Sequence, residues 1–241
     1  SIDNWFGNNS VQNYILIKGE VGVGKSMMVN SLLQTKSEDR LYLLAEGGIL
    51  SQSIPMFPFR ALFRRLFDKP QSEGVPYYSH VAQKLRPLAS KFKEEYHHLL
   101  NMILPVQFPP QSLKLSKRRC LQFYGELFQL LCTDKQVVFL HNFHRFDELS
   151  RAFVHYLRQI LPNRVMFIAS TIQDTLKERV NDSILLIELL SDFNEQQTKQ
   201  FLCNLVKCRE CDEEVLTFIS ATSRGLPLFM KELVMLLQTK K

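Results

Sequence analysis

Residues Gly19 to Ser26 read GEVGVGKS and fit the pattern G-x-x-x-x-G-K-[ST] at every position. Glycines at these positions let the main chain fold so that successive N–H groups point inward at phosphate oxygens. The lysine, Lys25, can reach the β- and γ-phosphates of a nucleotide, and the hydroxyl of Ser26 can coordinate Mg²⁺. The pattern predicts a phosphate-binding loop, and the absence of the guanine-reading sequence NKxD favours ATP over GTP.

The context of this loop agrees with its pattern. A short apolar strand is expected at 14–18, directly before the loop, and a helical pattern begins at Lys25. The positive end of that helix would add to phosphate binding, whereas a glycine-rich turn that merely joins a strand to a helix would not need the lysine. The expected nucleotide contacts are Gly19, Glu20, Val21, Gly22, Val23, Gly24, Lys25, Ser26 and Met27.

The segment VVFLHNFHRFDELS, residues 137–150, lacks residues that usually complete such a site. A parallel strand should deliver an Asp that holds the Mg²⁺ water shell, followed by an acid that positions the attacking water. Here the strand ends in His141 and Asn142, and a neutral imidazole and an amide cannot replace that charge. Asp147 comes later in the chain, past the strand end, so we do not expect it to substitute. Loss of the water-activating acid costs on the order of 10²–10⁴-fold in rate, so the sequence predicts impaired hydrolysis.

Apolar segments that alternate with amphipathic ones predict an α/β fold. The expected strands cover residues 14–18, 40–46, 136–141, 164–171 and 183–189. The expected helices cover 25–35, 56–67, 77–104 with an interruption near Pro87, 116–132 and 148–161. The strands are apolar almost throughout, which is typical of a parallel sheet covered on both faces. We therefore expect a P-loop NTPase core with a parallel five-stranded sheet flanked by helices.

Three consecutive helices are expected after the last strand, at 194–206, 212–223 and 227–239. Asn194 and Asp212 suit the N-caps of the first two, and Gly225 suits the end of the second. The expected organisation is therefore a core at 1–190 followed by a small helical lid subdomain at 191–241. Because the chain begins at Ser1 rather than Met, we also expect it to be part of a longer protein.

Composition restricts the class of protein. The 241 residues are 45% hydrophobic and 22% charged, and no apolar run approaches the roughly 20 residues of a membrane span. The five cysteines are odd in number and irregular in spacing, as in a cytoplasmic protein with reduced thiols. CREC, Cys208 to Cys211, has C-x-x-C spacing but no second pair that would complete a zinc site. The net charge of +6 comes largely from basic residues at helical spacing, which indicate solvated helix faces, so nucleic acid is not an expected partner.

Four blocks in order resemble the signal-transduction NTPases with numerous domains (STAND), relatives of the AAA+ ATPases. Residues 140–147 resemble the block LDDLHWAD of that class: Leu140, His144 and Asp147 match, while His141 and Asn142 occupy the two acidic positions. PMFPFRALFRRL resembles the helix after the second strand, FIASTIQD resembles the sensor strand, and SRGLPLFMKELVMLL resembles GNPLFLEEL. Within the class, LLNMILPVQFP resembles the ATPase region of soluble adenylyl cyclase-like proteins.

The resemblance implies further site residues and partners. Thr171 would be the polar sensor, and the turn of Gly225 and Pro227 would lie against the adenine. The chain would be a regulatory module of a signalling protein, with the remaining domains of its own chain as partners, including cyclase catalytic domains, and with other protein partners. No cyclase activity is implied for these 241 residues.

We therefore expect a cytoplasmic module that binds ATP or ADP with Mg²⁺ held through Ser26, and that hydrolyses ATP weakly or not at all. Three alternatives stay open. The first is a working ATPase in which another acid, such as Glu46, serves the metal. The second is an interaction scaffold that no longer binds nucleotide. The third is an ATPase that loads onto nucleic acid through its basic helices.

Overall fold

The computed structural model describes residues 13–34, 41–67, 77–103, 115–132, 135–172, 184–188 and 193–239. The strands are β1 (Tyr14–Lys18), β2 (Leu41–Glu46), β3 (Gln136–His141), β4 (Val165–Thr171) and β5 (Ile184–Glu188). The helices are α2 (Lys25–Gln34), α3 (Phe57–Phe67), α4 (Tyr77–Phe92), α5 (Glu94–Asn101), α6 (Lys117–Leu131), α7 (Glu148–Ile160), α8 (Glu195–Val206), α9 (Glu213–Ser223) and α10 (Pro227–Thr239). Two short 3-10 helices, η1 (Ile49–Gln52) and η2 (Phe143–Arg145), follow β2 and β3.

The strands form a sheet in the order β2-β3-β4-β1-β5. β3 pairs in parallel with β2 on one side and with β4 on the other. Every residue of β4 is buried, as are Gln136 to Leu140 of β3, because helices cover the sheet. The predicted α/β architecture, a parallel sheet flanked by helices, is confirmed.

The chain divides into two compact units. The described part of the first unit comprises residues 13–16, 41–67, 77–103, 115–132, 135–170 and 184–185. The described part of the second comprises 17–34, 171–172, 186–188 and 193–239. The phosphate-loop sequence and the last three helices therefore belong to one unit, and the end of β3 belongs to the other.

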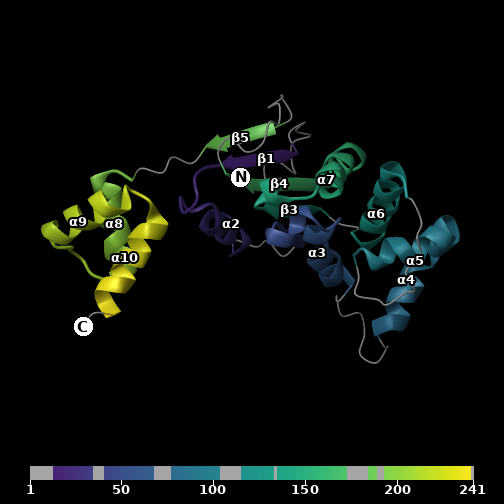
Figure 1. The fold of residues 1–241 in the computed structure, drawn as a ribbon, viewed down its shortest axis with the longest axis horizontal. Helices are drawn as coiled ribbons and strands as arrows, with labels where there is room; N and C mark the ends of the chain where they lie inside the picture. Colours follow the sequence, from purple (N-terminus) through teal and green to yellow (C-terminus); the bar gives the residue numbers. More distant parts are fainter. Residues whose placement is uncertain are drawn as a thin grey trace. The chain divides into compact units, whose positions relative to one another are not determined.

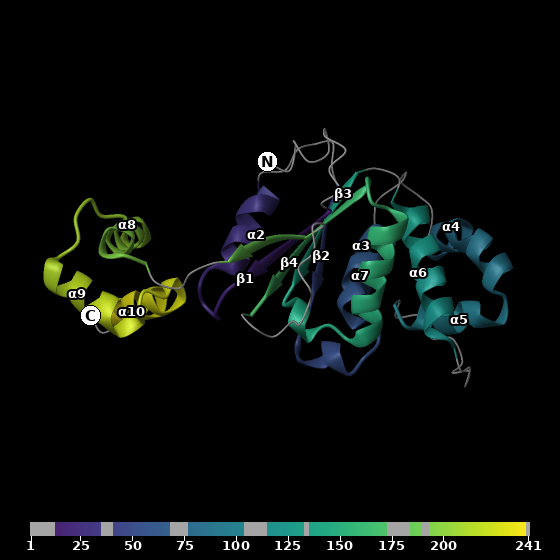
Figure 2. The ribbon, with the colours of Figure 1, turned by 90° about the horizontal axis from the view of Figure 1, so that it is seen from above.

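Aromatic side chains fill the core of the first unit between α3, α6 and α7. Phe153 lies edge-on to Phe59, with ring centroids 4.9 Å apart, and also contacts Phe63 and Tyr124. α6 and α7 approach closely at Gly125, where an added Cβ would lie 2.5 Å from a ring carbon of Tyr156. Figure 2 shows α6 beside α3 and α7, with α4 and α5 on its other side.

The helix break predicted near Pro87 is wrong: α4 continues through this proline to Phe92. The chain turns instead at Lys93, whose φ of 42° interrupts the helix before α5 begins. Leu85, Leu88 and Phe92 lie on one face of α4 and are buried. Burial of that face offsets the main-chain hydrogen bond that the proline removes.

The three helices expected after the last strand are present and lie together in the second unit, as Figure 1 shows. Their apolar side chains pack into a cluster of their own. Asn194 caps α8 through a reciprocal pair of hydrogen bonds with Gln197, and Asp212 caps α9 by accepting from the N–H of Glu214, as predicted. The left-handed turn that ends α9 starts one residue earlier than expected, at Arg224, and includes Gly225. The buried residues of the cluster are Leu202, Leu216, Ile219, Met230 and Val234.

Within the described residues, none of the helices combines the length and the apolar character needed to cross a membrane.

Candidate nucleotide-binding site

The GEVGVGKS segment forms a loop between β1 and the start of α2, as its sequence predicts. Gly22 and Gly24 adopt φ values of 90° and 106°, a region that L side chains rarely enter. α2 begins at Lys25, and its first turn is closed by the hydrogen bond from the N–H of Met28 to Gly24 O, at 3.0 Å. Glycine is therefore required at these two positions for the loop to enter the helix.

The Lys25 side chain turns back over the loop. Its Nζ donates to the carbonyl oxygens of Gly19, at 2.8 Å, and Glu20, at 2.7 Å, and the residue is buried. Burial lowers the pKa of Lys25 because desolvation disfavours the ammonium. A buried ammonium that donates to carbonyl oxygens is also a strong donor to an anion, so the loop can accept a phosphate group.

The first turn of α10 contacts the loop. The N–H of Leu228 donates to Gly22 O at 3.2 Å, and a Cβ added at Gly22 would lie 3.0 Å from Leu228 Cβ. Pro227, the first residue of α10, is buried beside this contact. The sequence indicated Pro227 but missed Leu228, whose only signal was its position next to that proline. Exposed apolar side chains also occur on these two segments: Val21, Met27, Leu228 and Phe229.

In the first unit, the side chain of Ser170 contacts the residues at the end of β3. Its Oγ lies 2.9 Å from His141 Nδ1 and accepts a hydrogen bond from the N–H of Asn142 at 3.2 Å. Ser170 is fully buried near the end of β4, one residue before the expected sensor, Thr171, which is also buried. Nothing in the local sequence pattern indicated this role of Ser170.

The residues after β2 also contact the end of β3. The N–H of Gly47 donates to His141 O at 2.8 Å, and a Cβ added at Gly47 would lie 2.5 Å from Asn142 O. Glu46 is the lateral partner of His141 in the parallel register, and it is exposed. Asn142 has φ 53° and ψ 48°, the left-handed conformation that Asn tolerates better than most residues. The register therefore places the carboxylate-bearing residue Glu46 directly beside His141.

Asp147 is engaged elsewhere. It is the N-cap of α7: its Oδ1 accepts from the N–H of Ser150 at 2.9 Å, and its Oδ2 accepts from Ser150 Oγ at 2.6 Å. Oδ1 also accepts from the N–H of Met56 at 3.4 Å. With its oxygens held by these donors, the buried Asp147 side chain serves the start of a helix.

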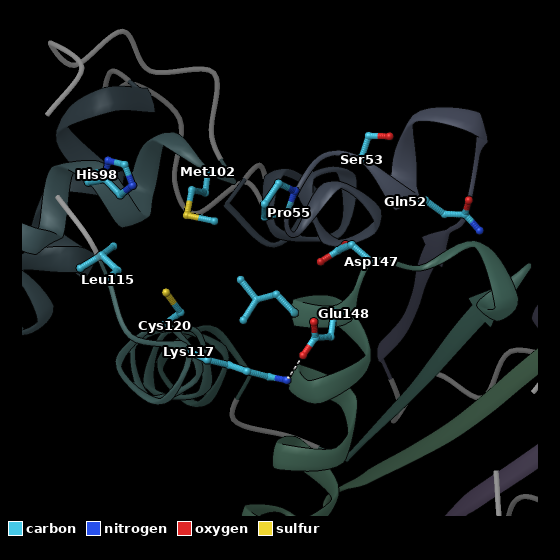
Figure 3. A pocket seen from close by; sticks show the side chains of 11 residues that line it. Gln52, Ser53, Pro55, His98, Met102, Leu115, Lys117, Cys120, Asp147 and Glu148 are labelled. Carbon is cyan, nitrogen blue, oxygen red and sulfur yellow. Dashed lines mark hydrogen bonds and ion pairs between the residues drawn. The ribbon is translucent and has the colours of Figure 1, made fainter. Parts of the chain in front are cut away.

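A cavity of about 510 Å³ lies in the first unit, between η1, α5, α6 and the start of α7 (Figure 3). It does not involve any of the expected nucleotide contacts. Lys117 and Glu148 form an ion pair of 2.7 Å at its wall, and burial raises the pKa of the Cys120 thiol. The lining residues are Gln52, Ser53, Pro55, His98, Met102, Leu115, Lys117, Cys120, Asp147, Glu148 and Leu149.

Residues 7–168 match the AAA ATPase domain family, which covers more than half of the chain, so the protein belongs to that family. No curated protein matches its sequence. The AAA+ P-loop class inferred from the sequence is thereby confirmed, and ATP with Mg²⁺ is what this family generally uses.

Solved structures of AAA+ proteins are similar to this chain at low identity, and the first of them shares its fold. The crystal structure of Cdc6p from Pyrobaculum aerophilum is 13% identical, with a TM-score of 0.56, over 97% of this chain and 57% of that one. The ORC2 protein of Aeropyrum pernix, solved as ADPNP-ADP complexes, is 13% identical with a TM-score of 0.47, over 95% and 57% of the two chains. RuvB of Thermotoga maritima, a Holliday junction branch migration motor, is 12% identical with a TM-score of 0.46, over 96% and 56%. The chain thus spans a little over half the length of these proteins.

Proposed function

We propose that this AAA+ domain binds MgATP as a regulatory ligand and hydrolyses it weakly or not at all, within a larger signalling protein of the STAND type. One observation carries the proposal: the phosphate loop is complete, while β3 ends in an imidazole and an amide and Asp147 is held as a helix cap. The resemblance to soluble adenylyl cyclase-like proteins makes cyclase catalytic domains of the same chain the proposed recipients of the signal.

ATP binding is supported by the donors that the loop provides. Lys25 Nζ would exchange its hydrogen bonds with Gly19 O and Glu20 O for phosphate oxygens, a stronger charge-assisted interaction. The main-chain N–H groups at the start of α2 would add further donors. Ser26, exposed in the first turn of α2, would supply the hydroxyl ligand for Mg²⁺, which neutralises charge on the phosphates.

Recognition of the base is assigned to the start of α10. Pro227 and Leu228 lie beside the loop, and an adenine ring is well matched by apolar contacts of this kind. Because α10 also contributes Met230 and Val234 to the cluster of the last three helices, a ligand that displaces its first turn acts on the whole cluster. Nucleotide occupancy would thus be transmitted to the helical part of the chain.

Impaired hydrolysis follows from the chemistry available at the end of β3. His141 and Asn142 offer a ring nitrogen and an amide where this class uses a metal-holding and a water-orienting carboxylate. The Ser170 hydroxyl fixes His141 and Asn142 in place without adding negative charge. Thr171 keeps its proposed role as the polar sensor at the end of β4.

The proposal is tested by titrating the protein with MgATP in a calorimeter and by following steady-state phosphate release on the same sample. We expect saturable binding with phosphate release near background. Lys25→Ala should abolish most of the binding, whereas Lys199→Ala, which removes an exposed lysine from α8 of the same unit, should preserve it. Equal MgATP affinities of wild type and Lys25→Ala would refute the assigned site. Rapid phosphate release by the wild type would refute impaired hydrolysis.

A working ATPase that uses Glu46 is the second candidate, and the register of the sheet favours it. Glu46 lies directly beside His141, so its exposed carboxylate flanks the position of the missing acid. This candidate requires measurable phosphate release that Glu46→Gln removes while nucleotide binding persists. The matched control is Glu210→Gln, an exposed glutamate in the turn between α8 and α9.

A further inference from the structure

Three cysteines lie at the end of α8 and in the turn that joins it to α9, in the second unit. Cys203 occupies the last turn of α8, Cys208 follows the helix end, and Cys211 precedes the N-cap of α9. Cys208 is exposed, and Cys203 and Cys211 are partly buried. The chain order is C-x-x-x-x-C-x-x-C, which by itself indicates no particular chemistry.

The helix end brings two of these cysteines together. Lys207 adopts the left-handed conformation, with φ 59° and ψ 39°, and its N–H donates to Cys203 O. The N–H of Cys208 donates to the same carbonyl at 3.1 Å. A 6→1 hydrogen bond around a left-handed residue is the hallmark of the Schellman motif, in which a contact between the side chains of the first and sixth residues is frequent. Here those residues are Cys203 and Cys208.

The geometry suits a covalent bond between the two sulfurs. The side chain of Cys203 reaches the residue that follows Cys208: its Sγ lies 3.9 Å from Arg209 O. The hydrogen bond from Cys208 N to Cys203 O limits the separation of their Cα atoms to roughly 7 Å by standard bond lengths. Disulfides join Cα atoms about 4.4–6.8 Å apart, so the main-chain separation at this helix end is compatible with one.

Metal binding does not explain the cluster. Among the residues that the structure describes, no three Cys, His, Asp or Glu side chains are placed to hold a metal ion. Cys211 packs against the apolar cluster of the last three helices, which favours a thiol that stays in place. Partial desolvation raises the pKa of the Cys203 thiol, and the neighbouring Cys208 and Cys211 raise it further, so exposed Cys208 is the first of the pair to react.

We propose that Cys203 and Cys208 are a redox-sensitive dithiol that forms a reversible disulfide by exchange with a low-molecular-weight disulfide such as oxidised glutathione. The Cys208 thiolate attacks one sulfur of the small disulfide, breaks its S–S bond and releases one small thiol. The Cys203 thiolate then attacks the Cys208 sulfur of the mixed disulfide and releases the second small thiol. Two protein thiols are oxidised, one small disulfide is reduced to two thiols, and the two protons leave on them.

The bond would tie the end of α8 to the turn that leads into α9. Leu202, next to Cys203, belongs to the apolar cluster shared by α8, α9 and α10. The disulfide therefore constrains the group of helices that the proposed function makes responsive to nucleotide, although the thiol chemistry does not depend on nucleotide binding. A redox signal would act on this part of the chain.

The sequence allows an unambiguous test, because trypsin cuts after Lys199, Lys207, Arg209 and Arg224 and places each cysteine on its own peptide. The folded 241-residue protein is incubated with oxidised glutathione, its remaining thiols are blocked by alkylation, and the digest is analysed by mass spectrometry without reduction. We expect peptide 200–207 linked to the dipeptide 208–209, or the uncut peptide 200–209 lighter by two hydrogen atoms. Dithiothreitol should restore both thiols.

Variants separate this pair from the alternatives. Cys211→Ser should leave the link intact, and Cys208→Ser, an exposed substitution, should abolish it while Cys203 stays a thiol. The wild-type protein should lose two free thiols at this turn. Stable glutathione on Cys208 without the link, a bond that includes Cys211, or no loss of thiols would each overturn the proposal.

Discussion

The main-chain N–H of Leu228, the second residue of α10, donates to the carbonyl oxygen of Gly22 at 3.2 Å. This hydrogen bond joins the start of α10 to the loop expected to hold phosphate. The Leu228 side chain also fills the space above Gly22, since an added Cβ would meet Leu228 Cβ at 3.0 Å. A change in the conformation of the loop therefore directly alters the contacts at the start of α10.

Gly22→Ala and Gly24→Ala should separate loop strain from the contact with α10. Both glycines have positive φ, so either substitution strains the loop and weakens ATP binding. Only Gly22→Ala also brings a methyl group against Leu228, because no atom of the described residues lies within 4 Å of a Cβ added at Gly24. We expect faster amide hydrogen exchange at the start of α10 in Gly22→Ala alone. Equal exchange there in both variants would show that the Leu228 contact does not couple the two segments.

Pro227→Ala should weaken binding of ATP by about tenfold, or 1.4 kcal/mol, and leave inorganic triphosphate nearly unaffected. Pro227 is buried at the start of α10 and is proposed to contact the base, whereas Lys25 is proposed to contact the phosphates. Calorimetric titrations with the two ligands make the comparison. If both ligands lose affinity equally, Pro227 acts through the phosphate loop and not on the base.

Gly47→Ala should destabilise the protein by about 1–3 kcal/mol. The new methyl group would lie 2.5 Å from Asn142 O, a main-chain atom that cannot rotate away. Gly48→Ala is the matched control, because its nearest neighbour, Ser51 Oγ, lies 3.9 Å from the added Cβ. Urea unfolding followed by circular dichroism gives both values. Equal free energies of unfolding for the two variants would mean that the turn after β2 accommodates the methyl group at position 47 without loss of stability.

The double variant His141→Asp and Asn142→Asp should strengthen the Mg²⁺ dependence of ATP binding and raise hydrolysis by about 10- to 100-fold, short of an efficient enzyme. Asp suits the left-handed conformation at position 142, and Ser170 Oγ can donate to a carboxylate at position 141. Phosphate release is measured across a Mg²⁺ titration.

The same double variant places two carboxylates side by side, because Glu46 is the lateral partner of position 141. Without Mg²⁺ their repulsion should lower the melting temperature at neutral pH, and Mg²⁺ should restore it. The single variant Asn142→Asp, which adds no charge at position 141, serves as the control. A melting temperature indifferent to Mg²⁺ would place the metal elsewhere.

ATP binding at alkaline pH should take up a proton through Lys25. Burial lowers the pKa of this lysine in the free protein from its usual 10.5. Phosphate oxygens would favour the ammonium and raise the pKa again, so between the two values the complex holds a proton that the free protein lacks. Binding heats in buffers of different ionisation enthalpy measure this uptake. Adenosine, which has no phosphates, should cause none, and proton release with ATP would contradict the assignment of Lys25.

The sequence by itself determined the features that a few contiguous residues encode. The loop from Gly19 to Ser26 could be predicted from eight contiguous residues, because its shape depends on glycine conformation and on the helix that follows. Asn194 and Asp212 were identified as caps because a cap bonds to residues two or three positions away. The strands and helices followed from the spacing of apolar residues, which is also local.

Tertiary structure alone decided which distant residues meet. Ser170 reaches His141 and Asn142 because β3 and β4 are neighbours, and Glu46 stands beside His141 because β2 and β3 pair in one particular register. α4 continues through Pro87 because packing of its buried face outweighs a local preference to break. Register and packing are properties of the whole chain: their free energies come from surfaces that meet only after folding, and no short stretch of sequence contains both sides of such a contact.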